Sequence, residues 1–521
     1  MFLNDLSVSI CGRRNSVARR FPVSLVLTAA TLFFLWAPLL QLGARSVILA
    51  TQNPSLWREL PVTAASRGVL FGTLELCVLS AILATILGIP LGFCLARGPK
   101  WLRVFAAIGC ALPLGVPPVI VAAPFTSARG AVDYPLFYAV LTLAMSFYPI
   151  VALSCGVAIA SLPRGEEEAA LLASGPLRAW FGVLGRRLFP AILGGAGAVA
   201  ALCAWEMGAP DLLSQPSFGM NTYRALNSPQ MLAPGESGAR AFIAALPVPF
   251  LALLFLIPTL RAMRDFGISI SNQNAAPTSR FAAFGAFVLL VSPGFILFQL
   301  LTSLESKTAI FTTISANEDA LRNTLIAATL AAATMTLGAL FLLFSWRNWP
   351  KIGRNFALSA ALLPGLCAPV VLAVALIEWW NRDTFAAIYD STLGMVLIGY
   401  AARFFPFALA LLWAPVSRFD AEMLFASQNV GASPLRTLFS IQIPLLKGPL
   451  AATFAVLWAL CAGELTISVL VHGPGGDTLP LPIFNLLHAG LAADVAALCL
   501  LLMSLCGTAM SLALVFLRPK L

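Results

Sequence analysis

Charged residues are scarce in this chain. Asp, Glu, Lys and Arg make up 10% of its 521 residues, whereas hydrophobic residues make up 59%. So low a charge excludes a soluble globular protein, whose surface is rich in charged side chains. The sequence has instead a series of apolar runs of about 18 or more residues, the length that a helix needs to cross a bilayer core.

Residues for metal and nucleotide chemistry are also few. His472 and His488 are the only histidines, which argues against a histidine-based metal centre. No GxxxxGK[ST] loop occurs, so we expect this chain to bind neither ATP nor any other cofactor. Nine of the ten cysteines lie within apolar runs, where cysteine packs as a small apolar side chain. Their spacing indicates neither a disulfide framework nor a zinc site.

Twelve apolar runs predict an all-α, polytopic membrane protein with about twelve transmembrane helices. The runs lie at residues 22–43, 68–95, 101–125, 135–160, 189–209, 240–262, 281–302, 320–345, 355–378, 388–414, 449–471 and 490–517.

The distribution of basic residues predicts the orientation in the membrane. With a cytoplasmic N-terminus, 22 of the 32 Lys and Arg residues fall in cytoplasmic segments, 9 in outer segments, and Arg403 within a span. This excess follows the positive-inside rule and places both termini in the cytoplasm, as expected of a multi-pass protein of a bacterial inner membrane. The net charge of +10 therefore sets topology, and nucleic acid is not an expected partner.

The chain also carries an internal duplication, in which motifs recur at offsets of 251 to 258 residues. The matching segments are LPLGVPPVIVA from Leu112 and LPGLCAPVVLA from Leu363, FYP from Phe147 and FFP from Phe404, and LCAWEM from Leu202 and LCAGEL from Leu460. Because each copy has an even number of spans, six, the two copies are parallel in the membrane. We predict a first half at 1–265, a linker at 266–280 and a second half at 281–521.

A long polar loop follows the fourth span of each half, at 161–190 and at 415–448. The first contains SGPLRAWF and the second ASPLRTLF, so both retain PLRxxF. Each loop begins with acidic residues and good helix formers, breaks at small residues and proline, and resumes as an amphipathic helix, which predicts two short helices at an angle. One such loop is simply typical of an interfacial helix. Two at equivalent positions favour a soluble partner that docks twice.

The two loops resemble the cytoplasmic loops of permease subunits of type I ABC importers, which run approximately EAAxxxGASxxxxFxxIxLP. A single chain with both halves looks like the fused permeases of the ferric-iron and thiamine importer group. The resemblance implies two copies of a separate ATP-binding cassette subunit, each contacting one loop, and an extracytoplasmic solute-binding protein. By position it assigns ATPase coupling to Glu167, Glu168, Ala169, Ala170, Gly175, Pro176 and Arg178 in the first loop, and to Ala426, Ser427, Gly431, Pro434, Arg436 and Pro444 in the second.

The two loops depart from the family pattern in different places. The second has Phe425 where the family glutamate falls, with Glu422 three residues earlier. The first has Arg186 in place of the proline of the LP pair. This difference suggests the hypothesis that the two loops contact their ATPase subunits unequally.

Two acidic residues occupy equivalent positions within spans, Glu206 in the fifth and Glu464 in the eleventh. An ionised carboxylate at the bilayer centre costs about 2.5–3.5 kcal/mol by insertion scales, so two at symmetric positions need a reason. Either they line the translocation path and meet a cationic solute, or they hydrogen-bond neighbouring helices whatever the solute is. Hard oxygen ligands suit iron(III), and acidic groups equally suit the fixed positive charge of thiamine.

The sequence thus predicts the membrane-spanning permease subunit of an ATP-driven importer, with iron(III) or a thiamine-like cation as the favoured solute. This chain itself is not expected to be an enzyme, because ATP hydrolysis falls to the partner subunit. The alternative is an ion-coupled secondary transporter with six plus six helices. Such a carrier predicts a charged signature between spans two and three, where this chain has the short segment ARGPKWLR.

Overall fold

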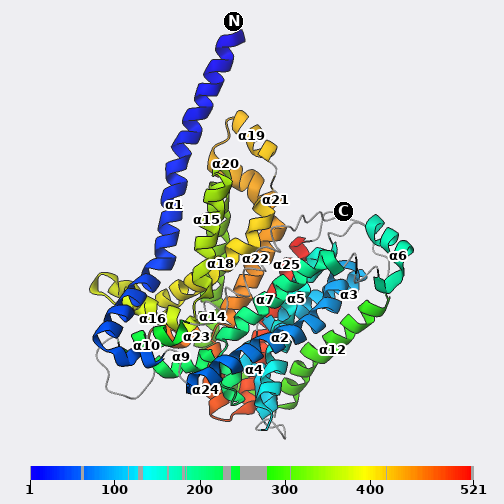
Figure 1. Cartoon of the computed structure of the whole chain (residues 1–521), viewed down its shortest axis with the longest axis vertical. Coiled ribbons are helices and arrows are strands. Elements are labelled where there is room, and N and C mark those ends of the chain that lie inside the picture. Colours follow the sequence, from blue (N-terminus) through cyan, green and yellow to red (C-terminus); the bar gives the residue numbers. More distant parts are fainter. Residues whose placement is uncertain are drawn as a thin grey trace.

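The computed structural model describes residues 2–59, 64–114, 116–126, 133–160, 164–178, 182, 185–226, 236–246, 279–304, 307–417, 419 and 421–517. Within these ranges the chain is helical and contains no strand, which confirms the predicted fold class. The helices form one bundle, shown in Figure 1.

The elements of the first half are α1 (Phe2–Gln52), η1 (Pro54–Glu59), α2 (Ala64–Arg97), α3 (Lys100–Leu114), α4 (Pro118–Thr126), α5 (Pro135–Ala160), α6 (Arg164–Arg178), α7 (Gly185–Trp205), α8 (Gly208–Leu212), α9 (Phe218–Leu226) and α10 (Glu236–Ala245). Those of the second half begin with α12 (Ser279–Thr302), α13 (Lys307–Ala316), α14 (Glu318–Ser345), η3 (Trp346–Asn348), α15 (Lys351–Leu362), η4 (Leu363–Leu366), α16 (Pro369–Trp380), η5 (Asp383–Phe385) and α17 (Ala386–Tyr389). They continue with α18 (Gly394–Ser417), α19 (Ala421–Asn429), α20 (Pro434–Thr437), η6 (Leu438–Gln442), α21 (Ile443–Leu445), α22 (Lys447–Ala462), α23 (Thr466–Val471), α24 (Pro480–His488) and α25 (Ala492–Leu517).

Ten of the twelve predicted spans correspond to helices that are long and apolar enough to cross a membrane. Among the described residues these are seven single helices and three helix pairs bent by more than 40°. The run at 281–302 coincides with α12, a helix of 24 residues. The run at 240–262 begins within α10 and then leaves the described residues at 247, as does most of the predicted linker at 266–280. The boundaries of the two halves therefore stay a prediction.

The third span of each half is broken at the same proline. α4 begins at Pro118 and bends by 81° from α3, whereas α16 begins at Pro369 and bends by 100° from the preceding helix. Proline suits the first turn of a helix because it has no N–H to leave unpaired there, and it ends the helix before it. The proline motifs that matched in sequence thus produce matching breaks.

Small residues bring α2 and α5 of the first half into close contact. A Cβ added to Gly88 would lie 2.7 Å from the Cβ of Val151, and one added to Gly92 would lie 2.8 Å from the Cβ of Cys155. Two glycines four residues apart share one helix face, which is the small-xxx-small pattern of close helix packing in membranes. α7 packs against both helices and completes a three-helix unit.

The first helix of each half crosses over to the other half. α1 packs against α14, α15 and α16 of the second half, and α12 packs against α2 and α3 of the first. Figure 1 shows α1 running along the outside of the bundle beside α15 and α16. Tryptophan N–H groups fix this contact: Trp346 Nε1 donates to Thr28 Oγ1 (2.7 Å), Trp349 Nε1 to Ser24 Oγ (2.8 Å) and Trp36 Nε1 to the Ala360 carbonyl (2.8 Å).

We predict that Thr28→Val weakens this contact, because it leaves the buried N–H of Trp346 without its acceptor. The expected loss is about 1–3 kcal/mol in the free energy of unfolding, the cost of one unsatisfied buried donor. Thr31→Val is the matched control, since the Thr31 hydroxyl bonds only to the Leu27 carbonyl of its own helix. Thermal unfolding of the detergent-purified chain measures both, and equal loss in the two variants would contradict the role given to Thr28.

Candidate functional site

The two loops that carry PLRxxF lie at the same end of the bundle. Figure 1 shows α19 of the second loop at the top of the bundle and α6 of the first loop at its upper right, both on the side away from α4 and α24. The breaks that follow α7 and α22 lie deeper in the bundle, toward α8 and α23. The predicted sites are therefore two separate regions, a pair of loops at one end and a pair of glutamates within.

In the first loop, α6 is kinked at Gly175, whose φ of 71° lies in the left-handed region. Only glycine adopts this region routinely, so the sequence SGP fixes the kink. Glu168, Ala169 and Arg178 are exposed to solvent. The remaining first-loop coupling residues are placed on α6 by the backbone alone, and their side chains lie outside the description: Glu167, Ala170 and Pro176.

The second loop is built as two short helices at an angle, as predicted. α19 ends at a turn in which Gly431 has a φ of 79°, and α20 then begins at Pro434. The buried hydroxyls of Ser427 and Thr437 lie 3.2 Å apart and tie the two helices together. The exposed residues of this set are Ala426, Gly431, Arg436 and Pro444. Left-handed glycines thus break both loops, although Gly175 adjoins its proline and Gly431 lies three residues before Pro434.

Sequence reasoning missed one feature of these loops. Leu172 on α6 and Val430 after α19 are each 88% exposed. They stand 258 residues apart, the same offset that relates the two PLRxxF motifs, so they are equivalent positions of the duplication. Aligning the loops pairs Leu172 with Val430, but only the structure shows that both side chains point into solvent.

The two glutamates stand where the fifth span of each half breaks. Glu206 follows the end of α7 and Glu464 follows α22, and the short helices α8 and α23 come next. Glu464 Oε1 accepts the N–H of Ile467 (3.1 Å). The Glu206 carboxylate lies near the N–H groups of Gly208 and Ala209, which stabilise its charge. Each glutamate therefore lies beside backbone donors at the start of the helix that follows it, which are otherwise unpaired.

Arg403 on α18 joins this pair, and the name glutamate site is used below for Glu206, Glu464 and Arg403. Arg403 Nε lies 3.1 Å from Glu464 Oε2, and the Glu464 side chain is only 7% exposed. Glu206 is close enough for both Arg403 and Glu464 to act on its carboxylate electrostatically. The arginine that the sequence left unassigned therefore belongs to the same site as the glutamates.

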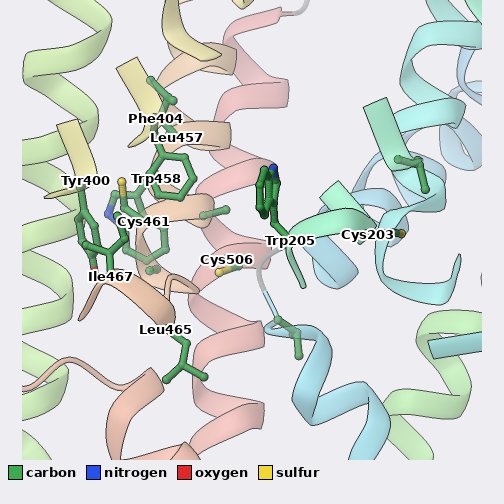
Figure 2. Packing of buried hydrophobic residues seen from close by; sticks show 14 of the residues in the cluster. Cys203, Trp205, Tyr400, Phe404, Leu457, Trp458, Cys461, Leu465, Ile467 and Cys506 are labelled. Carbon is green, nitrogen blue, oxygen red and sulfur yellow. The ribbon is translucent and has the colours of Figure 1, made fainter. Parts of the chain in front are cut away.

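Aromatic and sulfur-bearing side chains of the buried core lie near the ends of α7 and α22, just before Glu206 and Glu464 in the chain. Figure 2 shows Trp205, which precedes Glu206, lying between Trp458 on one side and Cys203 on the other, with Cys506 below it. Trp205 and Trp458 come from different halves, so the packing around the site joins the halves. The Trp458 N–H donates to Thr329 Oγ1 (3.0 Å) on α14.

A cavity of about 580 Å³ lies in the second half between the second loop and the glutamate site. Its walls come from α14, α22 and α25, with one residue of α21, Ile443. Leu450, Phe454 and Trp458 line it at a spacing of four, which places them on one face of α22. Trp458 lies four residues before the end of α22 at Ala462, or about 6 Å of helix, and Glu464 follows two residues later. The cavity is lined almost entirely by apolar side chains and threonines.

These features define a multi-pass helical membrane protein with a charged site at its centre and two matched loops at one end. No protein-family model matches the chain. It is 31% identical over 116 residues to PhnV, a permease protein named for 2-aminoethylphosphonate transport in Salmonella paratyphi A, which covers 22% of this chain and 44% of PhnV.

Two permease proteins of Escherichia coli are also similar. The spermidine/putrescine transport system permease PotC is 28% identical over 147 residues, covering 26% of this chain and 56% of PotC. The putrescine transport system permease PotI is 25% identical over 183 residues, covering 35% of this chain and 64% of PotI. The chain thus spans about half the length of the curated relatives it matches, and these relatives are permease subunits of transport systems.

We predict that Gly431→Ala destabilises the turn between α19 and α20. The left-handed conformation costs a residue with a Cβ about 1–2 kcal/mol. Hydrogen exchange of the amides in α19 and α20 is expected to quicken accordingly. Gly165→Ala is the control: Gly165 has open space around it and no positive φ, so that substitution should leave exchange unchanged or slow it. Unchanged exchange in Gly431→Ala would show that the turn does not depend on glycine.

Proposed function

We propose that this chain is the membrane permease subunit of an ATP-driven importer of a bacterial inner membrane, with both permease halves fused in one polypeptide. The two PLRxxF loops bind two copies of a soluble ATP-hydrolysing subunit on the cytoplasmic side, where both termini also lie. A binding protein delivers the solute to the opposite side. The closing of the ATPase pair moves the loops and switches access to the path between the halves.

The observation that carries this proposal is the matched exposure of Leu172 and Val430. An aliphatic side chain that is 88% exposed gains nothing from folding, and a single one needs no explanation. Leu172 and Val430 occupy duplicated positions on two loops at the same end of the bundle. They therefore offer two equivalent apolar surfaces to a partner. A protein partner that binds twice buries both of them.

The glutamate site supports a solute with positive charge. The names of the similar permeases, 2-aminoethylphosphonate, spermidine and putrescine, all denote compounds with an amino group. Within the described residues no group of three or more His, Cys, Asp or Glu side chains is placed to hold a metal ion. We therefore favour an organic cation that bears an amine, with thiamine-like cations as a related candidate and iron(III) as a weaker one.

The competing function is an ion-coupled secondary transporter. Uptake into proteoliposomes decides between the two, using a panel of putrescine, spermidine, 2-aminoethylphosphonate, thiamine and iron(III). The importer requires ATP, the ATPase subunit and the binding protein. If an ion gradient alone drove uptake, without ATP, the ATPase subunit or the binding protein, the importer hypothesis would be rejected.

We predict that Leu172→Asp and Val430→Asp each weaken binding of the ATPase subunit, because a buried apolar contact becomes a desolvated charge. Loss of a central contact of this kind corresponds to roughly a thirtyfold loss of affinity. Copurification of the subunit and ATP hydrolysis by the reconstituted complex measure the effect. Leu491→Asp is the control, since Leu491 is also exposed but follows α24 at the opposite end of the bundle. Normal subunit binding by both loop variants would refute the docking surface.

A further inference from the structure

The two glutamates of the glutamate site share one task. Each follows the end of a helix and lies beside backbone N–H groups at the start of the next short helix, α8 or α23. A carboxylate at that place offsets donors that a break within a membrane leaves unpaired. The shared geometry follows from the duplication, and it accounts for a glutamate in both halves. It does not account for the differences between them.

The second half gives its glutamate an arginine and a serine–tyrosine network that the first half lacks, although the Glu206 carbonyl also accepts a hydroxyl, that of Ser217 (3.4 Å). Glu464 is bonded to Arg403, and its carbonyl accepts the Ser468 hydroxyl (2.8 Å), which in turn lies 2.9 Å from the Tyr400 hydroxyl. The equivalent positions of the first half are occupied by residues that cannot form this network: Ser146 for Arg403, Pro210 for Ser468 and Leu143 for Tyr400. The Ser146 hydroxyl bonds instead to the Thr142 carbonyl of its own helix (3.0 Å).

Charge is therefore distributed unequally over the site. One arginine faces two carboxylates, and its ion pair is with Glu464. Arg403 Nη1 is buried and has no hydrogen-bond partner among the described residues, and the ion pair of Arg403 is with Glu464 rather than with Glu206. Nor does any other described Lys, Arg or His lie within ion-pair distance of Glu206, which is also more exposed than Glu464. An acidic group within the membrane that lacks a partner marks a functional position.

We propose that the two duplicated glutamates have different tasks: Glu206 contacts the positively charged group of the solute, an ammonium or comparable organic cation, whereas Glu464 and Arg403 are a positioning pair that holds the site together. Two carboxylates and one guanidinium leave one negative charge, which a cationic solute neutralises at Glu206. The pair Glu464–Arg403 is already neutral, because its two members pair with each other within the second half. This inference rests on the proposed function.

The test compares Glu206→Gln with Glu464→Gln in the complete complex of chain, ATPase subunit and binding protein. The probe is the member of the panel that the wild type imports in proteoliposomes. Glu206→Gln is expected to reduce ATP-driven uptake at limiting solute by at least about tenfold, the loss of one charge-assisted contact, with a wild-type thermal midpoint. Glu206→Asp, which keeps the charge, should restore part of the uptake.

Glu464→Gln is expected to act differently, through the thermal midpoint. Removing one member of a buried ion pair leaves the other charge unpaired, so Glu464→Gln and Arg403→Gln should each lower the midpoint, and the double variant should be more stable than Arg403→Gln alone.

Normal uptake by Glu206→Gln, or the same pattern of defects in both glutamate variants, would overturn the division of tasks. If iron(III) were the only member of the panel that the wild type takes up, the assignment of an organic cation as the solute would be wrong. Absence of ATP-driven uptake by the wild type would instead refute the proposed function.

Discussion

A backbone N–H that loses its helical acceptor inside a membrane must find another, and this constraint organises the centre of the molecule. The fifth span of each half breaks, and the break exposes donors at the start of α8 and α23. Water is not available to satisfy them in an apolar environment. The Glu464 carboxylate accepts one of them, and the Glu206 carboxylate lies near the equivalent ones. The site therefore needs acidic residues to satisfy its backbone donors, whatever the solute is. A carboxylate that has no ion-pair partner as well is available to bind a solute.

The same constraint shapes the contact between the halves. α1 leaves its own half and packs on the second, and its polar groups find partners there: the N–H groups of Trp346 and Trp349 bond to hydroxyls of α1. Interhelical hydrogen bonds of this kind contribute about 0.6–2 kcal/mol each in membranes. Together with the reciprocal packing of α12 on α2 and α3, they make the two halves one body around the glutamate site.

Duplication supplied two copies of every part, but the copies have diverged. Proline breaks the third span of both halves at the same place, and an exposed aliphatic residue occupies the same place in both loops. The matching breaks have the same local cause in both halves, a proline at the start of the following helix. The arginine at position 403 and the serine at position 146 differ, and the site between the halves is asymmetric as a result.

The sequence by itself determined the fold class, the places of ten long apolar helical segments along the chain, the equivalence of the proline motifs at Pro118 and Pro369, and the two-helix form of the second loop. These follow from local causes: apolar length, the missing N–H of proline, and the left-handed conformation open to glycine. The crossing of α1, the pairing of Arg403 with Glu464 and the exposure of Leu172 and Val430 required the tertiary structure. Each depends on which of several helices lies beside a given residue, and neither hydrophobicity nor spacing along one helix specifies its neighbour.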